Sequence, residues 1–155
     1  MLEVGVGNMT RHQEETHFSF WAALKSPLII GADVNNIRES SLEVLKNKEI
    51  IALNQDKLGV AVNYIPSLSR EGKYQVWAGP LKSGKSRHVI LVQNYGADPL
   101  DISLPVKQVP GLNEGHRQLV IRDVWAKKSL GKLGAAIALK GIEVDQVKVL
   151  VLSEK

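Results

Sequence analysis

Residues 17–33 read HFSFWAALKSPLIIGAD, and this stretch decides how the N-terminal part of the chain is interpreted. Apolar side chains recur there at steps of three and four residues, which predicts a helix from about His12 to Lys25 with one buried stripe. The side chains on this stripe are Phe18, Trp21, Ala22 and Leu24. The helix is expected to stop at Ser26-Pro27, because a residue before proline avoids the helical region of backbone space.

A short apolar run follows this helix, and a second helical segment follows the run. Leu28-Ile29-Ile30 has no polar alternation, which is typical of a strand buried on both faces of a parallel sheet. From about Ser40 to Leu53 the pattern is helical again, with Asn47 as a candidate break point. A helix–strand–helix arrangement is one unit of an α/β layer fold, and one unit cannot close a sheet or a barrel.

The pattern changes after Gly59. Strand-forming runs recur there, separated by Gly, Pro and Asn, which predicts an antiparallel sandwich or a small barrel. The runs are residues 73–77, 87–93, 100–104, 118–125, 135–139 and 147–152. We therefore divide the chain into an α/β part, residues 1–58, and an all-β part, residues 59–155.

Length and composition limit the fold. The chain has 155 residues, of which 44% are apolar. This length suits one domain or parts of two, but not a complete eight-fold α/β barrel, which needs about 250 residues. Because the sequence has no cysteine, neither a disulfide framework nor a thiolate metal site is possible. No apolar run reaches about 18 residues, so no membrane span is expected.

The charge pattern does not indicate a nucleic-acid partner. The formal net charge is +4, and Lys and Arg are scattered among Asp and Glu. Nucleic-acid binding would need basic side chains gathered on one face beside stacking aromatic groups. The densest basic group is Lys127, Lys128 and Lys132, which we interpret as solvent-exposed side chains of a turn rather than a phosphate-binding group.

The most conspicuous carboxyl groups have structural explanations. Asp33 follows the apolar run, and barrel enzymes place functional groups at the ends of strands. Beside two asparagines, however, Asp33 also fits a turn or a helix cap, and we prefer this interpretation. Asp56 fits a turn into the next segment. Glu14 and Glu15 are adjacent on a helix, so they face different directions and cannot act as a pair.

The sequence predicts neither a metal nor a cofactor. His12 and His17 are five residues apart, not the four that place two ligands on one helical face. The remaining histidines, His88 and His116, lie in the all-β part. The segment SGKS at 83–86 lacks the full spacing of a phosphate-binding loop and fits a hairpin turn.

The aromatic side chains bear on one candidate function, carbohydrate binding. Trp21, Trp77 and Trp125 lie in helical or strand runs, and we interpret them as core residues rather than sugar platforms. This candidate function is that of a non-catalytic carbohydrate-binding or interaction β-module, and it is the alternative to the function given below. It would gain support if Tyr64, Tyr74, Tyr95 or Trp77 were exposed and coplanar, and would fail if they were buried.

Five stretches carry a family resemblance. They are MLEVG at 1–5, HFSFWAALKSPLIIGAD at 17–33, NKEIIALNQD at 47–56 followed by Leu58-Gly59, VWAGPL at 76–81 and RDVWAKKSLG at 122–131. The first three resemble the last barrel units of the α-galactosidase (melibiase) family of glycoside hydrolases. The last two resemble its C-terminal β-domain. The motifs cover nearly the whole chain in the family's order.

The resemblance implies both a fold and a reaction. The fold is an α/β barrel remnant, about the last one to two βα units, followed by an antiparallel β-sandwich domain. The complete enzyme would hydrolyse terminal α-linked galactose with retention of configuration, which needs two carboxyl groups about 5 Å apart. In the family both are aspartates on earlier barrel strands, and a third, sugar-binding aspartate precedes the pair that matches Met1-Leu2.

We expect the chain to contain none of these three aspartates, and therefore no catalytic residue and no activity alone. The resemblance places Met1 at a position that lines the galactose pocket. The alternative is an initiator methionine without that role, which we prefer for the chain alone.

The remaining expectations concern partners and location. α-Galactosides are the partners implied for the full-length enzyme, and neither nucleic acid nor a membrane is expected. An incomplete barrel should expose apolar surface, which favours self-association. The resemblance implies an extracellular or vacuolar/lysosomal location.

Overall fold

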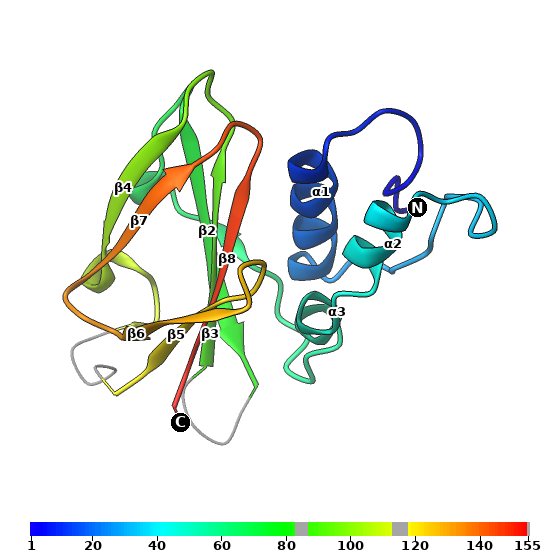
Figure 1. Cartoon of the computed structure of the whole chain (residues 1–155). Coiled ribbons are helices and arrows are strands. Elements are labelled where there is room, and N and C mark those ends of the chain that lie inside the picture. Colours follow the sequence, from blue (N-terminus) through cyan, green and yellow to red (C-terminus); the bar gives the residue numbers. More distant parts are fainter. Residues whose placement is uncertain (83–86, 113–117, 155) are drawn as a thin grey trace.

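A computed structural model describes residues 1–82, 87–112 and 118–154. Helices α1–α3 lie on one side of the molecule, and a β-sandwich forms the other side (Figure 1). The helices are α1 (Arg11–Ala23), α2 (Glu39–Leu45) and α3 (Lys48–Asn54). The strands are β1 (Asn63–Tyr64), β2 (Tyr74–Leu81), β3 (Arg87–Asn94), β4 (Leu100–Pro105), β5 (Val120–Asp123), β6 (Lys128–Lys132), β7 (Ala136–Ile142) and β8 (Val147–Ser153).

The strands within the described residues form two antiparallel sheets. The larger has the order β1-β2-β3-β8-β5-β6, and the smaller pairs β4 with β7. The antiparallel sandwich predicted after Gly59 is therefore confirmed. Strands β1 and β6 were not predicted, because β1 has only two residues and every residue of β6 is exposed. A fully exposed strand has no alternation of buried and exposed side chains to reveal it.

The larger sheet is covered on both faces. On one face Ile90 and Leu150 pack against Ile137 of the smaller sheet. On the other face Leu91 packs in a second cluster with Phe18 of α1. Since successive side chains of a strand point to opposite faces, strands β3 and β8 supply apolar groups to both clusters.

Helix α1 begins at a capping box. The Thr10 hydroxyl accepts a hydrogen bond from the Gln13 N–H at 3.3 Å, and the Gln13 side chain accepts one from the Thr10 N–H at 3.0 Å. The predicted apolar stripe is right for Phe18 and Ala22, which are fully buried. It is wrong for Leu24, which is 41% exposed because it lies beyond the last turn of the helix.

Asn47 separates α2 from α3. Its side-chain oxygen accepts hydrogen bonds from the N–H groups of Glu49 at 3.0 Å and Ile50 at 3.2 Å. These bonds satisfy two of the unpaired donors at the start of α3. The candidate break at Asn47 is therefore confirmed, and its cause is helix capping.

The run Leu28-Ile29-Ile30 is not the strand buried on both faces that we predicted. Ile30 forms a single parallel bridge with Leu2, while Ile29 and Ile30 are 57% and 42% exposed. Within the described part of the chain no strand other than this N-terminal segment lies beside the run. An apolar run is buried only where neighbours cover it, so this one stays exposed.

The helices complete the core of the larger sheet. The second cluster contains residues from both sides of Leu58-Gly59, such as Phe18 and Val62. The Val62 N–H also donates to the Ala23 carbonyl at 3.2 Å. The helices and the larger sheet therefore bury apolar surface against each other. The division of the chain into residues 1–58 and 59–155 stays a prediction.

Candidate functional site

Met1 lies at the edge where the N-terminal segment meets the run ending at Ile30. It is 73% exposed, and the bridge between Leu2 and Ile30 brings it beside Gly31. A Cβ at Gly31 would lie 2.8 Å from the Leu2 carbonyl oxygen and 3.5 Å from the Met1 Cβ. Glycine is therefore required where these two backbone segments approach. The Met1 side chain is therefore accessible to solvent at this edge.

Asp33 organises a turn beside this edge. One carboxylate oxygen accepts from the Asn35 N–H at 3.0 Å, and the other accepts from the Asn36 side-chain amide at 2.6 Å. The hydrogen bonds from Asn36 and Asn35 lower the pKa of Asp33. The turn interpretation of Asp33 is confirmed, since both of its oxygens are used to hold local backbone and side chain.

Asp56 has a similar role in the linker after α3. Its Oδ1 accepts from the Leu58 N–H at 3.1 Å and from the Lys82 N–H at 2.8 Å. Because Lys82 directly follows β2, this one carboxylate joins the linker to the end of a strand. The predicted turn role is confirmed.

Glu14 is a buried acceptor that the sequence reasoning missed. It is 1% exposed, and its Oε1 accepts from the Gly5 N–H at 3.0 Å, Arg38 Nη2 at 2.9 Å and Ser41 Oγ at 2.7 Å. It thereby joins the N-terminal segment, α1 and α2. The available signal was its position four residues before Phe18, which places both on one helical face.

Other carboxyl groups are held by arginines. Arg11 Nε lies 2.6 Å from Glu15, and its Nη1 lies 3.2 Å from Glu43. Arg122 donates to both oxygens of Glu49 at 2.7 Å, which lowers the pKa of Glu49. Glu15 therefore faces a different partner from Glu14, as predicted for adjacent helical residues.

The histidines that the structure describes make no metal site. No group of three His, Asp or Glu side chains gathers for metal binding in residues 1–82, 87–112 and 118–154. His17 Nε2 accepts from the Glu3 N–H at 3.1 Å, and burial lowers the pKa of His17. His116 and the predicted hairpin turn at 83–86 lie outside the described residues.

No helix in the described part is long and apolar enough to cross a membrane.

The rings of Tyr64 and Trp77 do not form a flat platform. Trp21, Trp77 and Trp125 are half-buried and pack against the second cluster, in agreement with a core role. Tyr64 is exposed, but its ring plane is tilted by 53° from that of Trp77 at a centroid distance of 5.4 Å. The coplanarity that would support the carbohydrate-binding alternative is therefore not found in this pair.

Family models match both parts of the chain. Residues 1–56 match alpha galactosidase A, and residues 71–152 match the alpha galactosidase C-terminal beta sandwich domain. The chain is similar to alpha-galactosidase of Saccharomyces paradoxus, 38% identical over 146 residues, and to alpha-galactosidase 3 of Arabidopsis thaliana, 42% identical over 130 residues. These matches cover 88% and 84% of the chain, which spans only 31% and 29% of the two relatives.

Solved structures agree with these matches. Alpha-galactosidase I from Mortierella vinacea has a TM-score of 0.87 and 33% identity, with 100% of this chain and 38% of that chain covered. The Saccharomyces cerevisiae enzyme, determined with raffinose, has a TM-score of 0.84 and 26% identity, with coverage of 99% and 46%. The chain therefore belongs to the α-galactosidase (melibiase) family of glycoside hydrolases and corresponds to the C-terminal portion of its members.

Proposed function

We propose that this chain is the C-terminal part of an enzyme that hydrolyses terminal α-galactosides with retention of configuration, and that the chain alone is inactive. The first statement rests on one observation: both family models match this chain, one after the other along the sequence. The raffinose in a related structure supports an α-galactoside as the substrate class of the full-length enzyme.

The placement of the acidic residues supports inactivity of the chain alone. Retaining hydrolysis needs a nucleophile and an acid about 5 Å apart, with the pKa of the acid raised. Glu15 and Glu43 both bond to Arg11, which occupies the position between them. The pKa of Glu49 is instead lowered by Arg122. A catalytic acid and nucleophile would then come from the rest of the full-length enzyme.

Met1 would line the galactose pocket of that enzyme, and its exposure at an open edge supports this role. The same edge exposes Ile29 and Ile30, which supports self-association of the chain alone. An extracellular or vacuolar/lysosomal location rests on the family resemblance.

Two assays test the proposal. In the first, the purified 155-residue chain is mixed with p-nitrophenyl α-galactoside. We expect no nitrophenol above the buffer control. Turnover that a substitution within this chain abolishes would show that the chemistry lies in these residues and would contradict the proposal.

In the second assay, this chain replaces the matched 38% of the Mortierella vinacea enzyme. We expect the chimera to hydrolyse the same substrate within about tenfold of the parent rate, a change of about 1.4 kcal/mol in the barrier. The Met1→Ala version should raise KM more than it lowers kcat. A chimera that folds but has no activity would contradict the assignment to this enzyme class.

A further inference from the structure

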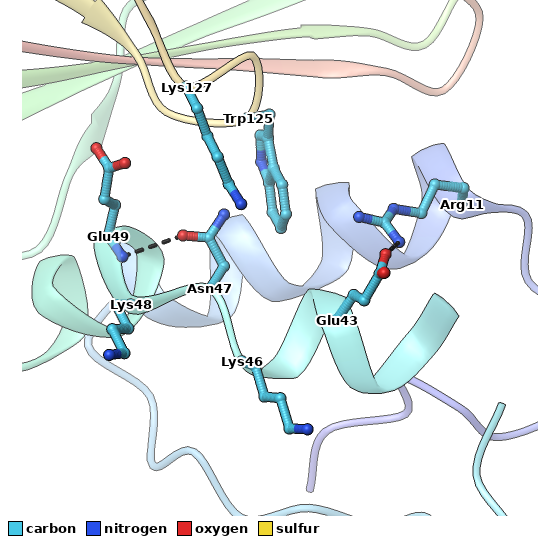
Figure 2. Close-up of a pocket in the computed structure, with 8 residues that line it drawn as sticks. All are labelled: Arg11, Glu43, Lys46, Asn47, Lys48, Glu49, Trp125 and Lys127. Atoms are coloured by element: carbon cyan, nitrogen blue, oxygen red, sulfur yellow. Dashed lines mark hydrogen bonds and ion pairs between the residues drawn. The ribbon is translucent and has the colours of Figure 1, made fainter. Parts of the chain in front are cut away.

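A groove lies where the helices meet the segment between β5 and β6. Its volume is about 710 Å³, within the range of small-molecule sites. The lining residues are Arg11, Glu43, Lys46, Asn47, Lys48, Glu49, Trp125 and Lys127 (Figure 2). Met1, the residue proposed to line the galactose pocket, is not among them.

Trp125 supplies a fixed aromatic face in this groove. Its Nε1 donates to Ser19 Oγ at 2.9 Å, and the buried Ser19 hydroxyl donates to the Glu15 carbonyl at 2.6 Å. The indole also packs against the second cluster. The ring is therefore oriented by the fold before any ligand arrives, as a binding platform requires. The flat face of an indole suits the C–H face of a pyranose ring.

Asn47 supplies an oriented donor from a largely buried residue. Only 8% of the residue is exposed, and its Oδ1 is already used by the N–H groups of Glu49 and Ile50. This capping fixes the orientation of the amide, so Nδ2 points into the groove toward Lys127 (Figure 2). Within the described residues Nδ2 has no acceptor. A donor held in place at the wall of a groove is ready to bind a ligand oxygen.

The acidic groups of the groove form ion pairs with arginines. Among the described residues its lysines form no ion pair, although the charge of Lys127 acts on Glu49 from a longer distance. Glu49 is bound through both oxygens by Arg122 at 2.7 Å, and Glu43 by Arg11 at 3.2 Å. In the part of the chain that the structure describes, no side-chain ion pair is formed by Lys46, Lys48 or Lys127. The remaining positive charge attracts an anionic ligand.

We propose that this groove binds a pyranose sugar that carries an anionic group, either a carboxylate, a sulfate ester or a phosphate ester. The sugar ring stacks on Trp125, and the oxyanion lies between the Asn47 amide and the Lys127 ammonium group. The site goes beyond the proposed function, because the terminal galactose of an α-galactoside is neutral.

Binding is measured by titration calorimetry on the full 155-residue chain. The probes are galacturonic acid, galactose 6-sulfate and galactose 6-phosphate, with neutral galactose and inorganic sulfate as references. We expect at least one acidic sugar to bind with a Kd on the order of 1 mM, about tenfold tighter than either reference. The acidic sugar that binds most tightly identifies the anionic group.

The variant Lys127→Gln should weaken binding of the acidic sugar by about fivefold and leave galactose unchanged. Lys140→Gln is the matched control, because it removes the same charge at an exposed position of β7. Trp125→Phe tests the fixed orientation of the ring, since it keeps an aromatic face but loses the bond to Ser19, and it should weaken binding of the acidic sugar. If this variant fails to fold, Lys46→Gln combined with Lys127→Gln tests the proposal through the charge alone and should weaken binding more than Lys127→Gln does.

Three results would overturn the proposal. The first is galactose or sulfate binding as tightly as every acidic sugar, because the ring and the anion would then not act together. The second is equal binding by the Lys127→Gln and Lys140→Gln variants. The third is the absence of both a heat of binding in calorimetry and a change in the NMR chemical shifts of the protein, when each acidic sugar is present at about twenty times the expected Kd.

Discussion

Arg122 on β5 binds Glu49 on α3 through two hydrogen bonds of 2.7 Å, one to each carboxylate oxygen. The two residues are 73 positions apart in the sequence, so the ion pair joins the sandwich to the helices. Their side chains are 41% and 37% exposed, and water therefore screens much of the attraction. The pair aligns two surfaces whose main stabilisation is the apolar cluster beneath them.

Arg122→Gln should lower the melting temperature near pH 7, and the deficit should disappear in acid. Arg122 lowers the pKa of folded Glu49 below the unfolded value of about 4.3. A depressed folded pKa gives a contribution that is complete above the unfolded pKa and is lost as pH falls through the folded pKa. Thermal unfolding at about pH 7 and about pH 3 measures the difference. Arg70→Gln, at an exposed position, is the control, and a deficit that persists in acid would refute this account.

Glu14→Ala should destabilise the chain by about 2–4 kcal/mol, because it removes the shared acceptor of Gly5, Arg38 and Ser41 and leaves donors unpaired. Urea unfolding followed by circular dichroism measures the loss. Glu39→Ala, at an exposed position of α2, should change the free energy of unfolding by less than about 0.5 kcal/mol. Equal losses in the two variants would mean that the Glu14 contacts contribute nothing beyond an ordinary surface carboxylate.

Self-association of the chain should depend on its exposed apolar edge. The double variant Ile29→Lys, Ile30→Lys places two charges on this edge, where like charges repel and desolvation is costly. We expect light scattering to show a smaller mass than for the unchanged chain at the same concentration. Leu130→Lys changes an exposed apolar residue of β6 and should leave the mass unaltered. If both variants behave alike, the edge is not the contact surface.

His17 should titrate below the usual histidine value of about 6.5. Burial lowers its pKa, and the Glu3 N–H donates to Nε2, which must be unprotonated to accept. The folded state therefore favours the neutral ring. Its contribution to stability is complete above about pH 6.5 and is lost as pH falls through the lower folded pKa. A proton NMR titration of the ring gives the midpoint, and a value at or above about 6.5 would contradict the expected direction.

The elements that were predictable from sequence are those whose side chains alternate between core and solvent or are buried throughout. Helix α1 followed from the spacing of Phe18 and Ala22, and β3 and β8 from strand-forming runs rich in apolar residues. Strand β6 was missed because its backbone pairs with β5 while its side chains remain in solvent. Hydrogen bonds of the backbone leave no trace in the sequence.

The roles of individual polar residues were predictable only where the partners are near in sequence. The turn at Asp33 followed from its neighbouring asparagines. The buried site of Glu14 did not, because Arg38 and Ser41 lie on a different segment. The burial predicted for Ile29 and Ile30 failed for a related reason, since a run of apolar residues does not specify which neighbours will cover it.

Strand β8 comes last in sequence but lies in the middle of the larger sheet, between β3 and β5 (Figure 1). Residues 147–153 must therefore leave the ribosome before β3 and β5 gain their shared neighbour. Until β8 is synthesised, the edges of β3 and β5 carry unpaired backbone N–H and C=O groups, which can pair with other chains. If synthesis stopped before β8, strands β1–β3 and strands β5 and β6 would lack the strand that joins them into one sheet.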